Sequence, residues 1–390
     1  MIRKNRFVPV LCTMLAAGMC LTGCGSTDPD QTVATINGTQ ISLGLANYMA
    51  QYTAVDYDTY YMSYFGSDMW TTTTSGSDET MTDRVKDNIL DTLEEYYLLE
   101  EHMDDYGVTV TSEELSEIET AAADFMAANS AEAIEAMGAS QEYVTEQLRL
   151  ATIQQKMYDA IVAGADTNVS DEECAQKTFS YVRVSKTTAD DDSEDLTDEE
   201  IEAAAKEKAQ EILDEAMSGS SDDSLKTAAE DHDVSKATCA YGASDLESDE
   251  DNSTYLDMAV LDAAETLSEG EYYESLIDTD DYYYVIRMDN LDDKDAAERE
   301  RKSIISERKQ TLYKETVSGY KEDAEWSIDE KVWEPVNFET LYTKSSVSTT
   351  NTTTDSTTDT TDTSSDSATD TTDTSSDTTT DTTDTTTDTE

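Results

Sequence analysis

The first regular pattern along the chain is the stretch 33–41, in which two short alternating runs flank Asn37-Gly38. An Asn-Gly pair between β-forming residues predicts a hairpin, because both positions accept a positive φ. Ser42 then stands where a helix N-cap is expected, and apolar residues recur at helical spacing after it. The pattern therefore predicts a β-hairpin that leads directly into a helix.

Helical periodicity continues as far as residue 164. After a loop rich in Thr, Ser and Gly at residues 65–78, the spacing of Val85, Ile89 and Leu93 predicts an amphipathic helix. The stretch 111–114 has the sequence of a capping box and is expected to start the helices that follow. Residues up to 164 are therefore expected to form an antiparallel helical lobe that carries one hairpin.

The next part of the chain mixes the two periodicities. The stretch 179–184 alternates like a strand, and capping boxes stand at 170–173 and 197–200. The elements expected from 179 onward are a strand, a helix from 197, a shorter helix at 224–231, a strand near 239–241, a helix at 255–267 and strands at 271–277 and 282–288. This order is β-α-α-β-α-β-β, and the whole chain is expected to belong to the α+β class.

Three further segments follow the last predicted strand. Residues 294–321 predict a long charged helix whose buried seam would include Ile304, Ile305 and Val317. Residues 326–338 predict a closing strand or packed arm. Beyond it the chain is almost entirely Thr, Ser and Asp, and we expect residues 341–390 to form a disordered tail, because they have almost nothing to bury.

The charge of the chain limits the classes of molecule that its surface can bind. It contains 88 acidic and 25 basic residues, which gives a formal net charge of -63. Such a surface repels nucleic acid and anionic lipid headgroups, so no nucleic acid is expected as a partner. Carboxylate pairs are frequent in so acidic a chain, and they therefore carry no information about catalysis.

The N-terminus has the layout of a secretory signal. A basic cluster (Arg3, Lys4, Arg6) precedes an apolar run that is too short for a permanent membrane helix. The run ends in Leu21-Thr-Gly-Cys24, which resembles the lipobox of bacterial lipoproteins. The resemblance implies that residues 1–23 are removed, that Cys24 is lipidated, and that residues 24–31 tether the protein to the outer face of a Gram-positive plasma membrane. The alternative is a membrane helix with an incidental cysteine.

The cysteine pattern argues against a metal site. Of five cysteines, only Cys174 and Cys239 lie beyond the signal and Cys24. No CxxC or Cys/His cluster exists in the sequence, so neither structural zinc nor another cofactor is expected. Whether Cys174 and Cys239 form a disulfide is left open.

Two stretches resemble extracytoplasmic foldases of the PrsA/SurA type. The hairpin and helix around Asn37-Gly38 are similar to the start of their N-terminal chaperone module. The β-α-α-β-α-β-β order and Leu267-Ser-Glu-Gly-Glu271 resemble a parvulin-type peptidyl-prolyl isomerase domain. The resemblance implies a SurA-N-like chaperone lobe at 32–168, a parvulin-like domain at 169–292 and a segment at 293–340 that returns to the lobe.

The catalytic residues of parvulins are largely replaced. The family site uses two histidines on neighbouring strands, and their places are taken here by Tyr181 and Tyr284. Cys239 lies near the third family position, with a small core residue as the alternative role. His102 and His232 lie elsewhere and are expected to be solvated. The resemblance therefore implies weak or absent isomerase activity.

Peptide binding is the function that would survive. Leu256 and Val260 stand where the family grips the proline ring, although ordinary core packing is an equal alternative. A second candidate surface consists of tyrosines at helical spacing near the start of the lobe, and packing on the next helix is the alternative for them. These residues are Tyr57, Tyr60, Tyr61 and Tyr64.

The sequence thus favours a lipid-anchored extracytoplasmic chaperone that binds unfolded or newly secreted proteins. A homodimer is left open. Two other functions are considered, namely an active peptidyl-prolyl cis-trans isomerase and a non-enzymatic surface lipoprotein for ligand binding or adhesion.

Overall fold

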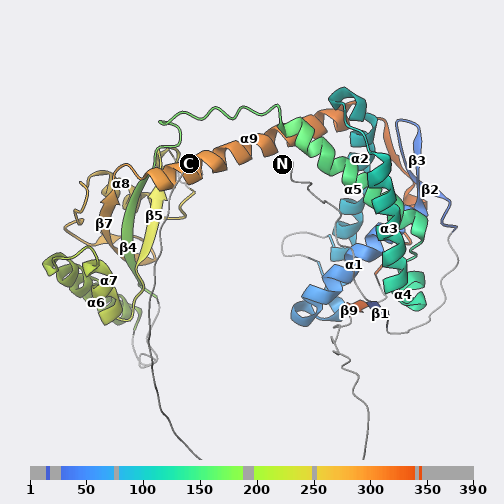
Figure 1. Ribbon diagram of the computed structural model, residues 1–390. Helices are drawn as coiled ribbons and strands as arrows, with labels where there is room; N and C mark the ends of the chain where they lie inside the picture. The colour runs from blue at the N-terminus through green and yellow to red at the C-terminus, as the bar shows by residue number, and fades with distance from the viewer. Residues whose placement is uncertain are drawn as a thin grey trace, which may run out of the picture. The chain divides into compact units, whose positions relative to one another are not determined.

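The computed structural model describes residues 15–17, 28–73, 79–187, 197–247, 253–338 and 342–344. Helices and small antiparallel sheets make up this part of the chain, as expected for an α+β protein (Figure 1). Cys24 and residues 345–390 of the expected tail lie outside the described residues. Among the described helices, none combines the length and the hydropathy that a membrane span requires.

One short β-ladder pairs a segment near the N-terminus with residues 342–344. Strand β1 (Leu15–Ala17) pairs antiparallel with β9 (Tyr342–Lys344). Strand β9 lies just inside the segment 341–390 for which a disordered tail is expected, and that tail stays a prediction. Since β1 lies within the expected signal peptide, cleavage before Cys24 would remove the partner of β9.

The predicted hairpin is present and becomes part of a three-stranded sheet. Strands β2 (Thr32–Ile36) and β3 (Thr39–Ser42) pair antiparallel, and the turn residues Asn37 and Gly38 have φ of 47° and 87°. The third strand, β8 (Trp326–Ile328), pairs with the other edge of β2. The arm from the far end of the sequence therefore packs with the hairpin, as expected.

Local capping determines where the first helices begin. The side chain of Ser42 accepts a hydrogen bond from the Leu45 amide, and capping boxes form at Thr80 and Thr111. We call these helices, together with β2, β3 and β8, the helical lobe. Its helices are α1 (Leu43–Phe65), α2 (Met81–Glu101), α3 (Ser112–Ala128), α4 (Ala131–Ala136) and α5 (Gln141–Val162), with 3-10 turns η1 (Ser67–Trp70) and η2 (Met103–Tyr106).

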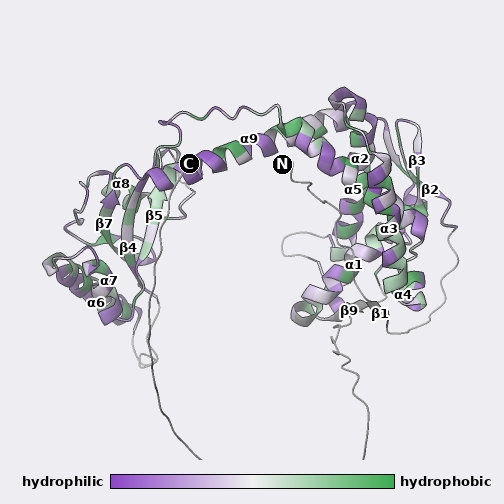
Figure 2. Ribbon diagram, in the orientation of Figure 1, coloured by the Kyte–Doolittle hydropathy of each residue, from purple (hydrophilic) through white to green (hydrophobic). Residues whose placement is uncertain are grey.

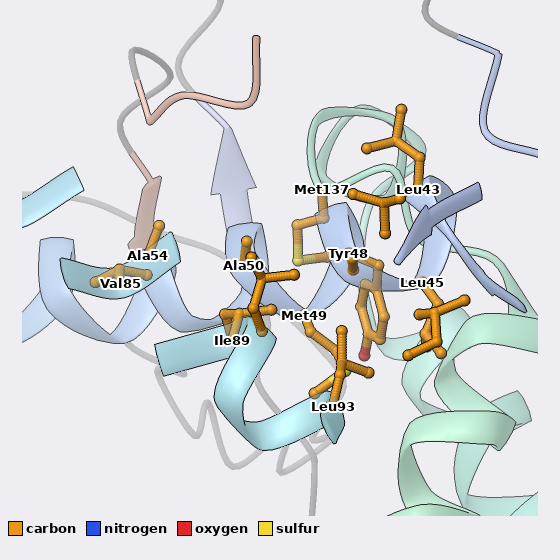
Figure 3. Close-up of a cluster of buried hydrophobic side chains, with 14 of the residues drawn as sticks. Leu43, Leu45, Tyr48, Met49, Ala50, Ala54, Val85, Ile89, Leu93 and Met137 are labelled. Atoms are coloured by element: carbon orange, nitrogen blue, oxygen red, sulfur yellow. The ribbon is translucent and has the colours of Figure 1, made fainter. Parts of the chain in front are cut away.

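The core of the lobe forms where α1, α2 and the hairpin meet. Tyr48 is fully buried and lies among Leu45, Met49 and Leu93 (Figure 3). The returning arm contributes to the same core through Trp333, which is 3% exposed, at the end of helix α10 (Glu330–Trp333). Residues that are almost 300 positions apart in sequence therefore share one hydrophobic core.

A second sheet has the strand order β5-β4-β7-β6, with every neighbouring pair antiparallel. We call it, together with its helices, the sheet domain. Helices α6 and α7 cover one face and α8 covers the other (Figure 1). The elements are β4 (Lys177–Ser185), α6 (Asp198–Ser218), α7 (Ser224–Asp231), β5 (Ala237–Tyr241), η3 (Ser244–Leu246), α8 (Met258–Glu265), β6 (Ile277–Asp278) and β7 (Tyr282–Asn290).

At 170–173 the Ser170 hydroxyl accepts a hydrogen bond from the Glu173 amide, as expected of a capping box, and the residues form a turn in which the Glu173 carboxylate pairs with Arg308. Two local predictions for this part of the chain are corrected. The helix expected at 255–267 spans only α8. The strand expected at 271–277 is reduced to a bridge between Tyr272 and Arg287 and the short β6, because the chain bends at 274–275.

Helix α9 (Lys294–Asp323) is largely hydrophilic, with separate hydrophobic bands (Figure 2). Val317 is buried against the helical lobe, but Ile304 and Ile305 are only half-buried, so the expected seam is shorter than the helix. The ammonium of Lys321 lies 3.1 Å from the carboxylate of Glu94 on α2, and the Glu94 side chain is 10% exposed. The second half of α9 is therefore joined to the lobe by both packing and charge.

Candidate functional site

Tyr181 and Tyr284, the two tyrosines expected at the degenerate site, lie side by side in the sheet domain. Arg183 on β4 pairs with Tyr284 on β7, and Tyr181 pairs with Ile286 two residues further along. Because side chains alternate along a strand, Tyr181 and Tyr284 project from the same face as diagonal neighbours. Their ring centroids are 6.0 Å apart, with an interplanar angle of 47°.

A third tyrosine extends this row, which we call the tyrosine face (Tyr181, Tyr282 and Tyr284). The rings of Tyr282 and Tyr284 are 5.9 Å apart, and the Arg183 guanidinium lies 4.8 Å from the Tyr282 ring. Burial raises the pKa of Tyr284. The nearby charge of Arg183 opposes part of this rise. Tyr284 is therefore a neutral phenol at neutral pH. It can donate and accept hydrogen bonds, but it cannot replace the proton chemistry of an imidazole.

Cys239 lies on β5 opposite Phe179, in the same core cluster as Tyr284. It is 7% exposed, and burial raises the pKa of its thiol to about 11. A thiol with this pKa stays protonated at neutral pH and is a poor nucleophile. Cys174 and Cys239 are both free, so they do not form a disulfide.

The expected proline-gripping residues lie in the core. Leu256 is 6% exposed and Val260 on α8 is fully buried, and both belong to the same core cluster as Phe179 and Ile286 of the sheet. This burial favours core packing, which was the alternative interpretation, over an open pocket at these two side chains.

Sequence reasoning did not identify what holds the loop before α8. The carboxylate of Asp245, which is 3% exposed, accepts hydrogen bonds from the Gly242 amide (2.8 Å), the Ser253 amide (2.9 Å) and the Ser253 hydroxyl (2.7 Å). Gly242 is required at its position, because an added Cβ would lie 2.6 Å from the Gln176 side chain and 2.9 Å from the Ala175 carbonyl oxygen. We therefore assign this loop a structural role.

Neither histidine reaches the tyrosine face. His102 stacks on Tyr320 with ring centroids 3.8 Å apart, and its Nδ1 lies 2.8 Å from the Asp105 carboxylate. His232 follows α7 and lies 3.2 Å from Glu215 on α6, which covers the opposite face of the sheet. Both histidines are half-buried rather than fully solvated, and neither supplies an imidazole to this site.

The tyrosines of α1 form a different surface, in the helical lobe. Tyr60, Tyr61 and Tyr64 are 63%, 47% and 81% exposed, and Phe65 beside them is 67% exposed. These three tyrosines are thus largely open to solvent, which favours a contact surface over full packing on the next helix, the alternative expected for them. Tyr57, by contrast, is half-buried, and its ring lies 5.8 Å from that of Trp70.

Beside these rings lies a groove of about 540 Å³. We call it the aromatic groove, and its lining comes from α1, η1, α2 and the residues between them. The lining residues are Tyr57, Tyr61, Phe65, Met69, Thr72, Thr73, Met81 and Arg84. Long, flexible methionine side chains adapt to irregular partners, and aromatic rings offer large contact areas. The groove can therefore hold apolar side chains of different shapes.

Trp70 fixes the floor behind the groove. It is 4% exposed, its indole Nε1 donates to the buried Asp58 carboxylate (2.9 Å), and its ring lies 4.6 Å from Phe338 of the returning arm. Sequence reasoning assigned 65–78 to a loop and missed Phe65, Met69 and Trp70. The available signal was a tryptophan and a methionine within a stretch that is otherwise small and polar.

No protein-family model and no curated protein matches the chain. It is similar to solved structures of PrsA foldases from several bacteria. The Lactococcus lactis foldase protein PrsA is 15% identical, with a TM-score of 0.32, and the match covers 79% of this chain and all of that one. The peptidylprolyl isomerase PrsA of Bacillus cereus is 18% identical, with a TM-score of 0.28, and the match covers 68% of this chain and 95% of that one.

Proposed function

We propose that this protein is a lipid-anchored, extracytoplasmic chaperone that holds unfolded, newly exported proteins and has little or no prolyl isomerase activity. The observation that carries the proposal is the exposed aromatic surface at the end of α1. Contiguous exposed apolar surface on a soluble protein marks a binding site for protein, membrane or ligand. Here Tyr60, Tyr64 and Phe65 present such a surface next to a groove that apolar side chains can enter.

The charge of the chain suits this role. A net charge of -63 keeps the protein soluble and opposes self-association while the aromatic surface stays open. The same charge repels the anionic headgroups of a membrane, so attachment would have to come from lipid on Cys24. Two acyl chains provide stable anchoring, whereas a single chain gives only marginal binding.

The sheet domain supports the second half of the proposal. Its tyrosine face presents phenol rings and no imidazole, burial raises the pKa of Tyr284, and the nearby Cys239 thiol stays protonated. Such a face can contact a peptide through ring stacking and hydrogen bonds. We therefore assign the sheet domain to peptide contact and the helical lobe to holding the client.

The proposal is tested by the aggregation of an unfolded secreted protein in the presence of the full chain. Wild type is expected to suppress light scattering, whereas a Tyr60→Ser, Tyr64→Ser, Phe65→Ser variant should need about tenfold more protein for the same protection, since each lost ring removes contact area. The matched control is Tyr255→Asn, because Tyr255 is 95% exposed in the sheet domain. No protection by wild type, or full protection by the triple variant, would refute the proposal.

A further inference from the structure

The segment that supplies most of the aromatic groove is unusual in its charge. Residues 43–80 contain five carboxylates and no lysine, arginine or histidine. Among the described residues that line the groove, Arg84 is the single cation. The rings therefore stand in a surrounding of net negative charge.

Carboxylates also crowd the start of α2, which forms one wall of the groove. Glu79 and Asp83 flank Met81 in sequence, and Asp87 follows one turn after Asp83. The pKa of Asp87 is raised by partial burial and, in addition, by the charges of Glu79, Asp83, Asp91 and Glu330. These carboxylates therefore lie close to one another at the start of α2, where Met81 and Arg84 line the groove.

We propose that the aromatic groove selects client segments in which lysine or arginine alternates with apolar side chains. This inference rests on the chaperone function proposed above and adds the chemistry of the client. Apolar side chains would enter the groove between Phe65 and Met81, and the intervening cations would lie over the faces of Tyr61 and Tyr64. A cation over an aromatic ring is attracted by the negative face of the ring, and nearby carboxylates strengthen this attraction.

The chain uses the same contact within its own fold. The Lys86 ammonium lies 5.5 Å from the ring of Trp333, and the Lys186 ammonium lies 4.6 Å from the ring of Tyr283. In both places a cation covers an aromatic face beside a carboxylate-rich surface. The rings at the end of α1 are exposed to solvent, so a cation of a bound peptide can reach them.

The test measures binding of the full chain to fluorescent peptides by anisotropy. Three peptides of one length share the same apolar positions and carry lysine, serine or glutamate at the positions between. The lysine peptide is expected to bind about tenfold more tightly than the serine peptide, since two or more cation–π contacts would form. Raising the salt from about 0.05 M to about 0.5 M should remove most of the long-range part of this preference.

Two sets of variants separate the groove from the overall charge. Replacing Tyr60, Tyr61 and Tyr64 by serine leaves the net charge unchanged, so a general attraction of cations to an acidic protein would persist. We expect the preference for lysine to fall to about twofold or less in this variant. The variant Glu79→Gln, Asp87→Asn should weaken the lysine peptide several-fold and leave the serine peptide unchanged, and Tyr255→Asn should change neither.

The outcomes distinguish this inference from the function on which it rests. Equal binding of the lysine and serine peptides, with aggregation still suppressed, would overturn the inference and leave the chaperone function standing. A lysine preference that survives in the tyrosine variant would also overturn it, because the selection would then lie outside the groove. If no peptide binds and aggregation is not suppressed, both fail.

Discussion

In the presence of the full chain, the cis-trans exchange of an X-Pro peptide is expected to stay within about twofold of its uncatalysed rate. Uncatalysed exchange takes roughly tens to hundreds of seconds. The barrier to this rotation is about 18–20 kcal/mol, and lowering it requires groups that stabilise the twisted peptide bond. The tyrosine face offers Tyr181 and a buried, neutral Tyr284, whereas both histidines lie elsewhere in the fold.

A protease-coupled assay with a proline-containing peptide measures this exchange, with an active parvulin as the positive control. Tyr284→Phe provides the matched variant, since it removes the hydroxyl and keeps the ring. Both forms of the protein should give the uncatalysed rate. Appreciable turnover by wild type that drops in Tyr284→Ala, with the fold retained by circular dichroism, would show that the tyrosine face is catalytic.

Replacing Trp333 by alanine is expected to lower the free energy of unfolding by about 3–5 kcal/mol, the usual cost of removing a buried aromatic ring. Trp333 is 3% exposed and belongs to the same core as α1, α2 and the hairpin, although it comes from the returning arm. Domains of this size are stable by only about 5–15 kcal/mol, so the loss should remove much of the stability of the lobe.

Urea denaturation followed by circular dichroism provides the measurement for Trp333→Ala. Glu334→Ala is the matched control. The Lys86 ammonium donates to the backbone carbonyl oxygen of Glu334 (3.1 Å), and an alanine at this position keeps that carbonyl. The control should change the free energy of unfolding by less than about 0.5 kcal/mol. A Trp333→Ala variant as stable as wild type would contradict the assignment of the arm to the core of the lobe.

The parts of the fold that depend on local chemistry could be predicted from the sequence. Asn37-Gly38 forms the expected turn because both residues adopt positive φ, and Thr111 and Thr197 form the expected capping boxes. Each of these features depends on residues within four positions of one another. Contacts between distant residues, such as the pairing of Glu173 with Arg308 of α9, carry no such local signal.

The candidate site was only partly predictable for the same reason. The alternation of residues predicted the strands that carry Tyr181 and Tyr284, but the register that brings the two rings together depends on the pairing of β4 with β7, and the burial of Val260 depends on the packing of α8. The aromatic groove depends on Trp70 being held by Phe338 and Asp58. No periodicity in residues 65–78 indicates contacts of this kind.

The central claim is that unfolded clients are held on the aromatic surface of α1. A photoreactive phenylalanine analogue placed at position 64, and in a matched variant at position 255, reports directly where a client lies, because both native tyrosines are largely exposed, at 81% and 95%. The account predicts strong crosslinking of an unfolded secreted protein from position 64 and little from position 255. Equal capture at both positions, or capture from position 255 alone, would contradict it.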